Sequence, residues 1–205
     1  MIGVGKEYWE KEWDKRIEKN AEGEGVSVKR NQSKFGKIFY ELGKRTHIVD
    51  VEKLDVGCGP SILALYMGQF TDERFLPTYT GIDLSKNAID WCKGYGINAV
   101  QGDVFTYPFN KKFRCFMFWD VLEHIPNHKT LAKRIKELAS NDFYIIGNIP
   151  LYTSDHANQV GGFEQPMDVN KLFDFLQCCG AIGFEQEIYG AYGYPYMFFE
   201  AHVTK

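Results

Sequence analysis

The chain has 205 residues, which is enough for one domain with a full hydrophobic core and too few for two ordinary domains. Hydrophobic residues make up 44% and charged residues 25% of the sequence, and these proportions exclude wholesale disorder. A net charge of -3 argues against an enzyme that works on long nucleic acids, because such proteins normally carry a basic surface.

Residues 1–46 differ in composition from the rest of the chain and predict a helical cap. Tyr8, Trp9 and Trp13 recur at helical spacing, so one face of a first helix is aromatic. A loop and a second helix are predicted to follow. The charged residues between 29 and 45 are basic except for one glutamate, which fits either the solvated face of a helix or a contact with an anionic substrate or RNA.

Strands and helices alternate from residue 52 onward, and we assign residues 47–205 to one α/β domain. The predicted helices cover 61–70, 85–96, 128–140 and 168–180. The predicted strands cover 53–57, 78–83, 97–103, 114–120 and 142–149, and two more within 184–205 form a hairpin through Gly190–Pro195. This pattern predicts a Rossmann-like, doubly wound sheet of seven strands, mostly parallel with a C-terminal antiparallel hairpin strand and with helices on both faces.

The end of the first predicted strand, residues 54–61, is a candidate ligand loop. Ligands of doubly wound sheets bind at the carboxyl ends of the strands, where the strand order reverses. Gly57 and Gly59 allow a sharp turn and the close approach of a ligand. A dinucleotide fingerprint would require a third glycine where this chain has Ile62, so nicotinamide cofactors are disfavoured.

Acidic residues follow the next predicted strands. Asp83 stands 24 positions after Gly59, where a carboxylate can accept hydrogen bonds from both hydroxyls of a ribose. Asp103 follows the third strand and suits an exocyclic amino group. The fourth strand ends in FWDVLEHIP, residues 118–126. Each of these strand ends therefore offers polar groups to one ligand.

The segments LDVGCGP, GIDLS, QGDVF and FWDVLEHIP, in this order and spacing, resemble the successive motifs of class I S-adenosylmethionine (SAM)-dependent methyltransferases. The resemblance covers about residues 50–205 and implies SAM as the cofactor and S-adenosylhomocysteine (SAH) as its product. The segment DVLEHIP resembles the EH-containing subset of the family, many members of which modify small molecules, including O-methyltransferases of the ubiquinone pathway.

The resemblance also implies which residues contact SAM. The implied contacts are Asp55, Gly57, Cys58 and Gly59 under the methionine moiety, Asp83 on the ribose, Leu84 on the adenine, Gly102, Asp103 and Val104 toward the adenine edge, and Asp120 with Val121 near the transferred methyl group. Ser61 replaces a third glycine that the family often has, which leaves the path of the loop open. From the residues alone, Asp55 could instead cap the following helix and Asp103 could be a turn residue. Trp91 and Cys92 are expected in the core.

A sulfonium is an activated methyl donor, so the protein needs mainly to align the acceptor with the S–CH3 bond. A base helps most when the acceptor is a hydroxyl. The candidate bases are Glu123, His124, Asp155 and His156. For His124, a structural hydrogen-bonding role at the head of a helix is an equal alternative.

A metal site is a further hypothesis for the same residues. Asp120, Glu123 and His124, with His156 after the fifth strand, resemble the E-x-x-E-H…H metal site of small-RNA 2′-O-methyltransferases. Such a site could hold a divalent ion that deprotonates a hydroxyl. The first ligand is Asp in this chain, which shortens its reach, so the metal stays unassigned.

Acceptor specificity is expected from the N-terminal helices and from the loop 151–167. The predicted acceptor-binding residues are Tyr8, Trp9 and Trp13, which would fold over the cofactor as a lid, and Tyr152 with Phe163, which would shape the pocket. An aromatic face that simply packs on the domain is the alternative for the tryptophans. Gly161 and Gly162 would let this loop hinge.

We predict that the chain is an enzyme, a SAM-dependent methyltransferase of a small-molecule acceptor, with oxygen before nitrogen. The alternatives are a metal-assisted O-methyltransferase of an RNA end or a sugar hydroxyl, another SAM-derived transfer such as aminopropyl transfer, and a SAM-binding module without turnover. Methylation of DNA bases is disfavoured, because NIPLY at 148–152 departs from N-P-P-Y and no Pro-Cys pair is present.

The cysteines and the apolar runs bear on the compartment. Five cysteines without a C-x-x-C pair predict neither a disulfide framework nor structural zinc. No apolar run is long enough to span a membrane, and the first residues lack the apolar stretch of a signal peptide. We therefore expect a reduced, cytoplasmic compartment and no membrane partner; the oligomeric state is not predicted.

Overall fold

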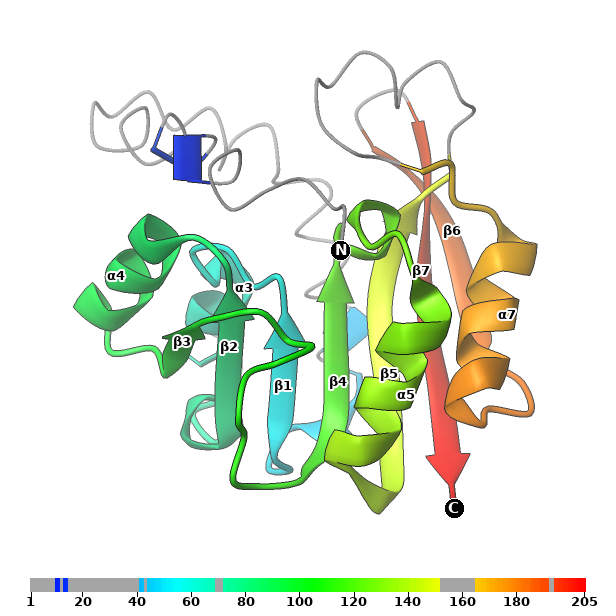
Figure 1. Cartoon of the computed structure of the whole chain (residues 1–205), viewed down its shortest axis with the longest axis horizontal. Helices are drawn as coiled ribbons and strands as arrows, with labels where there is room; N and C mark the ends of the chain where they lie inside the picture. Colours follow the sequence, from blue (N-terminus) through cyan, green and yellow to red (C-terminus); the bar gives the residue numbers. More distant parts are fainter. Residues whose placement is uncertain are drawn as a thin grey trace.

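A seven-stranded sheet, in the order β3-β2-β1-β4-β5-β7-β6, forms the centre of the described part of the chain (Figure 1). The computed structural model describes residues 10, 11, 13, 14, 41, 42, 44–68, 72–151, 165–191 and 194–205. The strands are β1 Lys53–Val56, β2 Tyr79–Asp83, β3 Ala99–Gln101, β4 Phe113–Trp119, β5 Ala139–Pro150, β6 Glu185–Ala191 and β7 Tyr194–Thr204. The predicted fold class is confirmed, including the antiparallel hairpin of β6 and β7.

The strand order reverses between β1 and β4. β1 pairs in parallel with both β2 and β4, and β4 pairs in parallel with β5. The carboxyl ends of these strands lie at the upper edge of the sheet in Figure 1. Because the connections that leave β1 and β4 diverge to opposite sides, this edge is where a doubly wound sheet binds its ligand.

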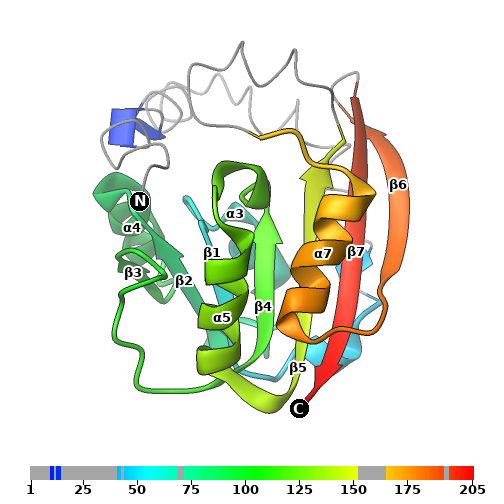
Figure 2. The same cartoon turned by 45° about the vertical axis from the view of Figure 1, so that its right-hand side comes forward.

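Helices cover both faces of the sheet, with α5 and α7 together on one face and α3 and α4 on the other (Figures 1 and 2). Strand β4 shows how the sequence produces these layers, because its side chains alternate. Phe116 and Phe118 enter the core under α5 and α7, whereas Cys115 and Met117 enter the core with α3 and α4. The helices are α3 Ile62–Tyr66, α4 Lys86–Gly94, α5 His128–Leu138 and α7 Val169–Cys179, with 3-10 turns η1 Thr46–Ile48, η3 Leu76–Thr78 and η4 Leu122–His124.

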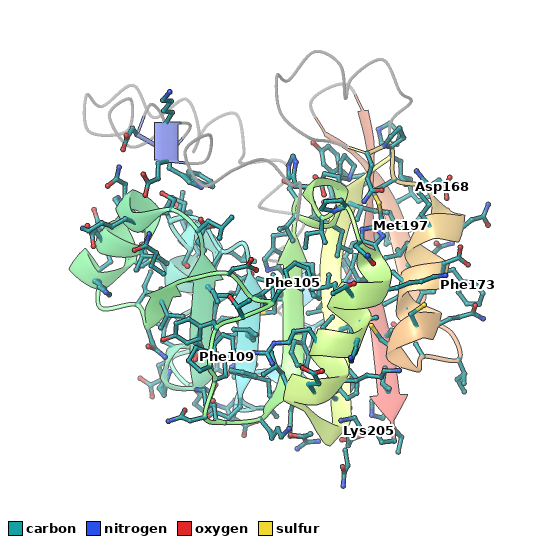
Figure 3. All side chains as sticks on the ribbon, viewed as in Figure 1. Phe105, Phe109, Asp168, Phe173, Met197 and Lys205 are labelled. Atoms are coloured by element: carbon teal, nitrogen blue, oxygen red, sulfur yellow. The ribbon has the colours of Figure 1, made fainter. Side chains whose placement is uncertain are left out.

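Aromatic rings fill the core on the α5 face. Phe109, Phe113, Phe116 and Phe143 contact one another in series, edge to face, with ring centroids between 5.3 and 6.0 Å apart. Phe105 and Phe109 reach this core from the connection that follows β3 (Figure 3). Edge-to-face contacts are a favourable arrangement of aromatic rings and hold this connection against the sheet.

Side-chain caps fix the starts of three helices: Ser85 caps α4, Asn127 caps α5 and Asp168 caps α7. The Ser85 hydroxyl accepts a hydrogen bond from the backbone N–H of Ala88 at 3.2 Å, which confirms the predicted start of α4. Asp168 caps α7 in the same way, and Gly180 ends that helix in the left-handed conformation. None of the helices in the described ranges is long and apolar enough to cross a membrane.

The predicted start of α3 and the predicted end of α5 are wrong. Ser61 has φ of 51° and cannot be helical, so α3 begins at the next residue. The helix predicted to reach residue 140 ends at Leu138, and Ala139 already pairs with Phe113 of β4. Pairing with neighbouring strands extends β5 in both directions beyond its predicted range, because the ladder satisfies backbone groups that a helix end would leave open.

Lys53 is the first residue of β1, at the edge of the sheet opposite the carboxyl ends of the strands, and is fully buried. Its ammonium group donates to the carbonyl oxygens of Val49 at 2.9 Å and Phe75 at 3.2 Å and also contacts the Thr78 hydroxyl. Burial lowers the pKa of Lys53 to about 8. The Lys53 side chain therefore joins β1 to the turn before it and to η3, the turn that precedes β2. Its role is structural.

Candidate active site

A tight turn follows β1 and contains two glycines in the left-handed region, Gly57 with φ of 66° and Gly59 with φ of 51°. A Cβ at Gly57 would lie 2.4 Å from a methyl group of Val121, and a Cβ at Gly59 would lie 2.5 Å from the ring of Trp13. Only glycine fits both the backbone conformation and the space at these positions. The turn therefore lies directly against the end of β4 and against the N-terminal segment.

Asp83, at the end of β2, joins this turn to the neighbouring strand ends. Its carboxylate accepts hydrogen bonds from the backbone N–H groups of Gly59 and Ser85, each at 2.8 Å. Its carbonyl oxygen accepts the N–H of Gly102 after β3 at 2.9 Å. Burial raises the pKa of Asp83, and the two N–H donors oppose that shift. The predicted ribose carboxylate is thus held in place by the loops that surround it.

Asp55 lies in β1, behind the glycine turn, and is only 2% exposed. The Tyr79 hydroxyl lies 2.7 Å from Asp55 Oδ2 and 2.9 Å from the Ser61 hydroxyl, so Asp55 does not cap α3. Its other oxygen, Oδ1, is buried without a hydrogen-bond partner among the described residues. Burial raises the pKa of Asp55 to about 7, against the lowering effect of the Tyr79 hydrogen bond.

The raised pKa of Asp55 makes the stability of the cofactor-free protein depend on pH. Between the ordinary value of 3.8 and about 7, the folded state keeps a proton that the unfolded chain has lost. The stabilisation is therefore complete below the lower value and is lost as the pH rises through the upper one. We expect the free energy of unfolding to fall by about 1.4 kcal/mol per pH unit in this window. Asp55→Asn should remove that slope in denaturant titrations; parallel pH profiles of the two proteins would contradict this.

The residues after β3 form a turn. The Asp103 carboxylate accepts the N–H of Phe105 at 2.9 Å, and the Asp103 carbonyl oxygen accepts two further N–H groups. Asp103 is therefore a turn residue, which is one of the two roles that the sequence leaves open. Asp103 is half-buried, whereas Val104 is buried and belongs to the core under α5. Leu84 is half-buried after β2, and its carbonyl oxygen accepts the Gln101 amide at 3.1 Å.

Asp120 and Asn148 meet at the ends of β4 and β5. Asp120 has φ of 50°, a conformation that residues other than glycine rarely adopt. The amide nitrogen of Asn148, which is fully buried, donates to Asp120 Oδ1 at 2.7 Å. In the sequence, the NIPLY segment singles out Asn148 only as part of a departure from a DNA-methylation motif. Its position as a polar residue at the end of an apolar strand was the signal for a role at this site.

Glu123 and His124 lie in η4, which directly follows Asp120 and Val121. Glu123 is buried and 2% exposed, whereas His124 is half-buried. The backbone N–H of Gln165 donates to the Glu123 carbonyl oxygen at 2.9 Å, and the Gln165 amide donates to the Ile125 carbonyl oxygen at 2.6 Å. Gln165 therefore fixes the chain just before α7 to η4 and the residue that follows it.

Residues 10, 11, 13 and 14 of the predicted cap lie over the same edge of the sheet (Figure 1). Trp13 covers Gly59, the backbone N–H of Lys86 donates to Glu10 at 3.4 Å, and the Asn87 amide contacts the Asp14 carboxylate. The other predicted cap, loop and base residues lie outside the described residues: Tyr8, Trp9, Tyr152, Asp155, His156 and Phe163. In the described ranges, no three His, Cys, Asp or Glu side chains gather as a metal site.

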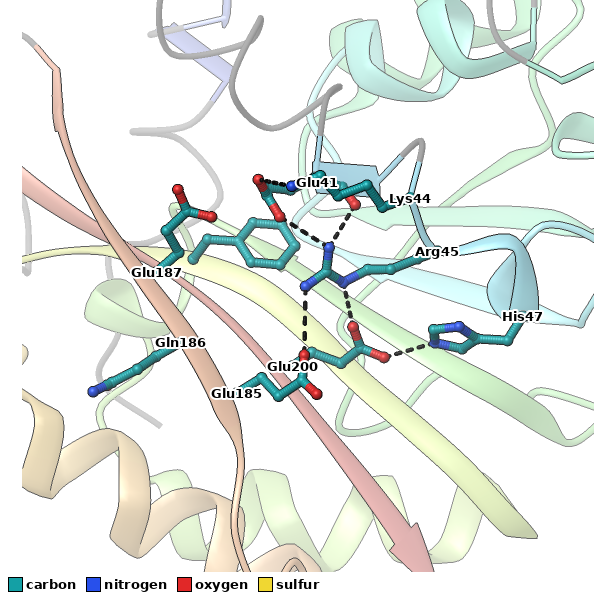
Figure 4. A pocket seen from close by; sticks show the side chains of 9 residues that line it. Glu41, Lys44, Arg45, His47, Glu185, Gln186, Glu187 and Glu200 are labelled. Atoms are coloured by element: carbon teal, nitrogen blue, oxygen red, sulfur yellow. Dashed lines mark hydrogen bonds and ion pairs between the residues drawn. The ribbon is translucent and has the colours of Figure 1, made fainter.

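A hollow of about 410 Å³ lies away from these strand ends, between the segment before β1 and strands β6 and β7 (Figure 4). Arg45 lies at its centre, where it pairs with Glu41 and Glu200 and stacks over the Phe198 ring at 4.6 Å. His47 contacts the same Glu200 carboxylate at 2.6 Å. The basic side chains of this hollow are paired with Glu41 and Glu200, and none of the strand-end carboxylates lines it.

The sequence pattern of a family described as "Methyltransferase domain" matches residues 8–185. The match spans most of the chain, and the chain therefore belongs to this family. The class I SAM-dependent methyltransferase predicted from the four motifs is confirmed, as is the prediction that the chain is an enzyme. None of the curated proteins matches the sequence.

Solved structures of methyltransferases share the fold. Magnesium protoporphyrin IX methyltransferase from Synechocystis PCC 6803, with bound SAH, has a TM-score of 0.65 and 15% identity, over 84% of this chain and 83% of that one. A SAM-dependent methyltransferase from Archaeoglobus fulgidus has a TM-score of 0.63 and 16% identity, over 82% and 94%. The N-methyltransferase NodS from Bradyrhizobium japonicum, with SAH, has a TM-score of 0.58 and 11% identity, over 83% and 88%.

Proposed function

We propose that the chain binds SAM across the carboxyl ends of β1 to β4 and transfers its methyl group to a small molecule, with a hydroxyl as the favoured acceptor. The observation that carries this proposal is the hydrogen bond from the Gly59 N–H to Asp83. This bond brings the glycine turn and the ribose carboxylate to one place, although 24 positions separate the two residues.

Three features of the site fit SAM. The turn at Gly57 and Gly59 leaves no room for side chains and presents backbone at the end of β1. Asp83 uses each carboxylate oxygen for one N–H, and carboxylate oxygens have capacity for further donors such as ribose hydroxyls. Asp55 Oδ1 is a buried acceptor without a partner among the described residues, as expected of a group behind a cationic ligand.

The contacts of the N-terminal cap support a role for this segment as a lid. Trp13 contacts the glycine turn, and Glu10 and Asp14 contact the start of α4, so the segment closes over the strand ends from outside. A closed lid excludes water from the methyl group and from the acceptor. Tyr8, Trp9, Tyr152 and Phe163 remain proposed acceptor contacts.

For the base, the structure favours His124 over Glu123, because His124 is the more accessible of the two. Asp120, held by Asn148, would line the site beside the methyl group. A base at this position would accept the proton of a hydroxyl acceptor during transfer. His156 remains a proposed alternative.

We expect SAH formation with a subset of a panel of phenols, sugars, amines and RNA ends, hydroxyl acceptors foremost. His124→Gln should lower kcat with the best hydroxyl acceptor by about tenfold, a modest loss because the sulfonium is already activated. Mass spectrometry of the product identifies the methylated atom, and calorimetry gives the affinity for SAH.

His202→Gln is the matched control, since His202 is exposed on β7 and contacts Asp142 near the start of β5, at the edge of the sheet opposite the carboxyl ends of the strands. An unchanged kcat in His124→Gln would remove the base assignment. SAH binding without turnover on any acceptor would favour the binding module, and activity abolished by a chelator would favour the metal-assisted alternative.

A further inference from the structure

Two cysteine side chains from distant parts of the sequence meet beneath the glycine turn. Cys58 stands between Gly57 and Gly59, and Cys92 lies in α4. The sulfur atoms of both cysteines lie 3.4 Å from the same carbonyl oxygen, that of Gly59. Cys92 Sγ also lies 3.4 Å from the Ser61 hydroxyl. The two thiols are therefore neighbours inside the candidate cofactor loop.

The Cys58 thiol points away from the surface that would face the cofactor. A Cβ added at Gly81, in the middle of β2, would lie 2.6 Å from its sulfur atom, so the thiol packs under the turn against the sheet. Cys92 is fully buried, and Cys58 is half-buried. Methyl transfer as proposed above uses neither thiol.

The surroundings give the two thiols different reactivity. The hydrogen bond that Cys92 shares with Cys58 lowers the pKa of Cys92, whereas burial raises the pKa of Cys58. The thiolate is the reactive form of cysteine, so the lowered pKa makes Cys92 the more readily ionised of the two thiols. An attacking thiolate next to a second thiol is the arrangement that leads to a disulfide.

We propose that Cys58 and Cys92 form a reversible disulfide with hydrogen peroxide as the oxidant, and that this bond weakens cofactor binding. The effect on binding rests on the proposed role of the glycine turn. The Cys92 thiolate attacks one peroxide oxygen, which gives a sulfenic acid and releases hydroxide. The Cys58 sulfur then displaces the sulfenic oxygen, which leaves as water with the Cys58 proton. The two sulfurs lose two electrons, and peroxide takes up both.

A disulfide would move the glycine turn because bonded sulfurs lie much closer than sulfurs in contact. Cys92 is held within α4, whose start is capped by Ser85. Cys58 lies between two left-handed glycines, which offer the least backbone resistance. The turn is therefore expected to shift toward α4 and to lose the bond from the Gly59 N–H to Asp83.

The test treats the full chain with hydrogen peroxide, blocks the remaining thiols by alkylation and maps the peptides by mass spectrometry. Calorimetry then measures SAH affinity before oxidation, after it and after reduction with dithiothreitol. We expect a peptide that joins Cys58 to Cys92, an affinity at least about tenfold weaker, and recovery on reduction. SAH should also shift the dithiol–disulfide equilibrium toward the reduced form, because coupling between binding and oxidation is reciprocal.

Cys92→Ser should have the same affinity for SAH before and after treatment with peroxide. Cys92→Ala is a second variant if the first does not fold. Cys178→Ser is the matched control, since Cys178 is also half-buried but lies in α7, on the other face of the sheet. Thiol loss without the Cys58–Cys92 peptide would overturn the inference and leave the proposed function standing. The cross-link with unchanged affinity would overturn the link to cofactor binding.

Discussion

Asp83→Ala is expected to weaken the binding of SAH by about 100-fold or more, which corresponds to about 3 kcal/mol. The carboxylate is expected to accept both ribose hydroxyls, and hydrogen bonds to a charged group contribute about 1.5–3 kcal/mol each. The same change removes the acceptor of the Gly59 and Ser85 N–H groups, so the loop also loses its position. Calorimetric titration with SAH, and with SAM, measures the effect.

Asp90→Ala is the matched control, because Asp90 is an exposed carboxylate of α4 whose partner is Lys86. It should leave the affinity within about twofold of the original, as expected for an exposed ion pair. Asp83→Asn separates charge from shape: it keeps one acceptor oxygen and should bind SAH with intermediate affinity. Asp83→Ala that binds SAH as tightly as the unchanged protein would refute the ribose assignment.

Gly57→Ala is expected to reduce SAH affinity by about 100-fold as well, through a different physical cause. The left-handed conformation costs a residue with a Cβ about 1–2 kcal/mol. The new methyl group would also lie 2.4 Å from a methyl group of Val121, and overpacking in a tight site costs about 1–3 kcal/mol. Thermal unfolding of the cofactor-free variant, measured beside SAH binding, shows how the penalty divides between stability and affinity.

The double variant Gly57→Ala with Val121→Ala tests this reasoning. It removes the contact with Val121 and keeps the backbone strain, so it should recover part of the lost stability. Gly94→Ala is the control, because Gly94 is the last residue of α4 and a Cβ there would meet nothing within 4 Å. Alanine favours helix over glycine, so this variant should be neutral or slightly more stable. Equal effects of Gly57→Ala and Gly94→Ala would contradict the packing argument.

The sequence predicted the alternation of strands and helices because each element carries its own periodicity. Strand β4 is apolar on both faces and α4 starts at a capping serine, and both signals are local. The boundary between α5 and β5 was not predictable in this way. Ala139 continues a helical pattern, yet it joins β5 because Phe113 of a distant strand pairs with it. Tertiary pairing therefore outweighed local preference there.

The candidate site was predictable to the level of strand ends, and not to the level of side-chain contacts. Asp83 could be predicted as the ribose contact because the topology of a doubly wound sheet brings the end of β2 to the ligand. The contacts of Asp120 with Asn148, and of Cys58 with Cys92, join residues that no spacing relates. Cys92 was expected in the core, where it lies, but its contact with the Gly59 carbonyl depends on how α4 packs.

Strand β7 pairs with β5 over nine residues and with β6 on its other side, although it comes after both in the chain. Within the part of the chain that the structure describes, β6 has no neighbour in the sheet except β7. During synthesis, β5 therefore has a bare edge until β7 emerges, and β6 cannot add to the sheet by itself. The hairpin is expected to form first and then attach as a unit, so the half of the sheet away from the cofactor is assembled last. Substitutions in β7 should consequently slow maturation of the enzyme more than they change the chemistry of the finished site.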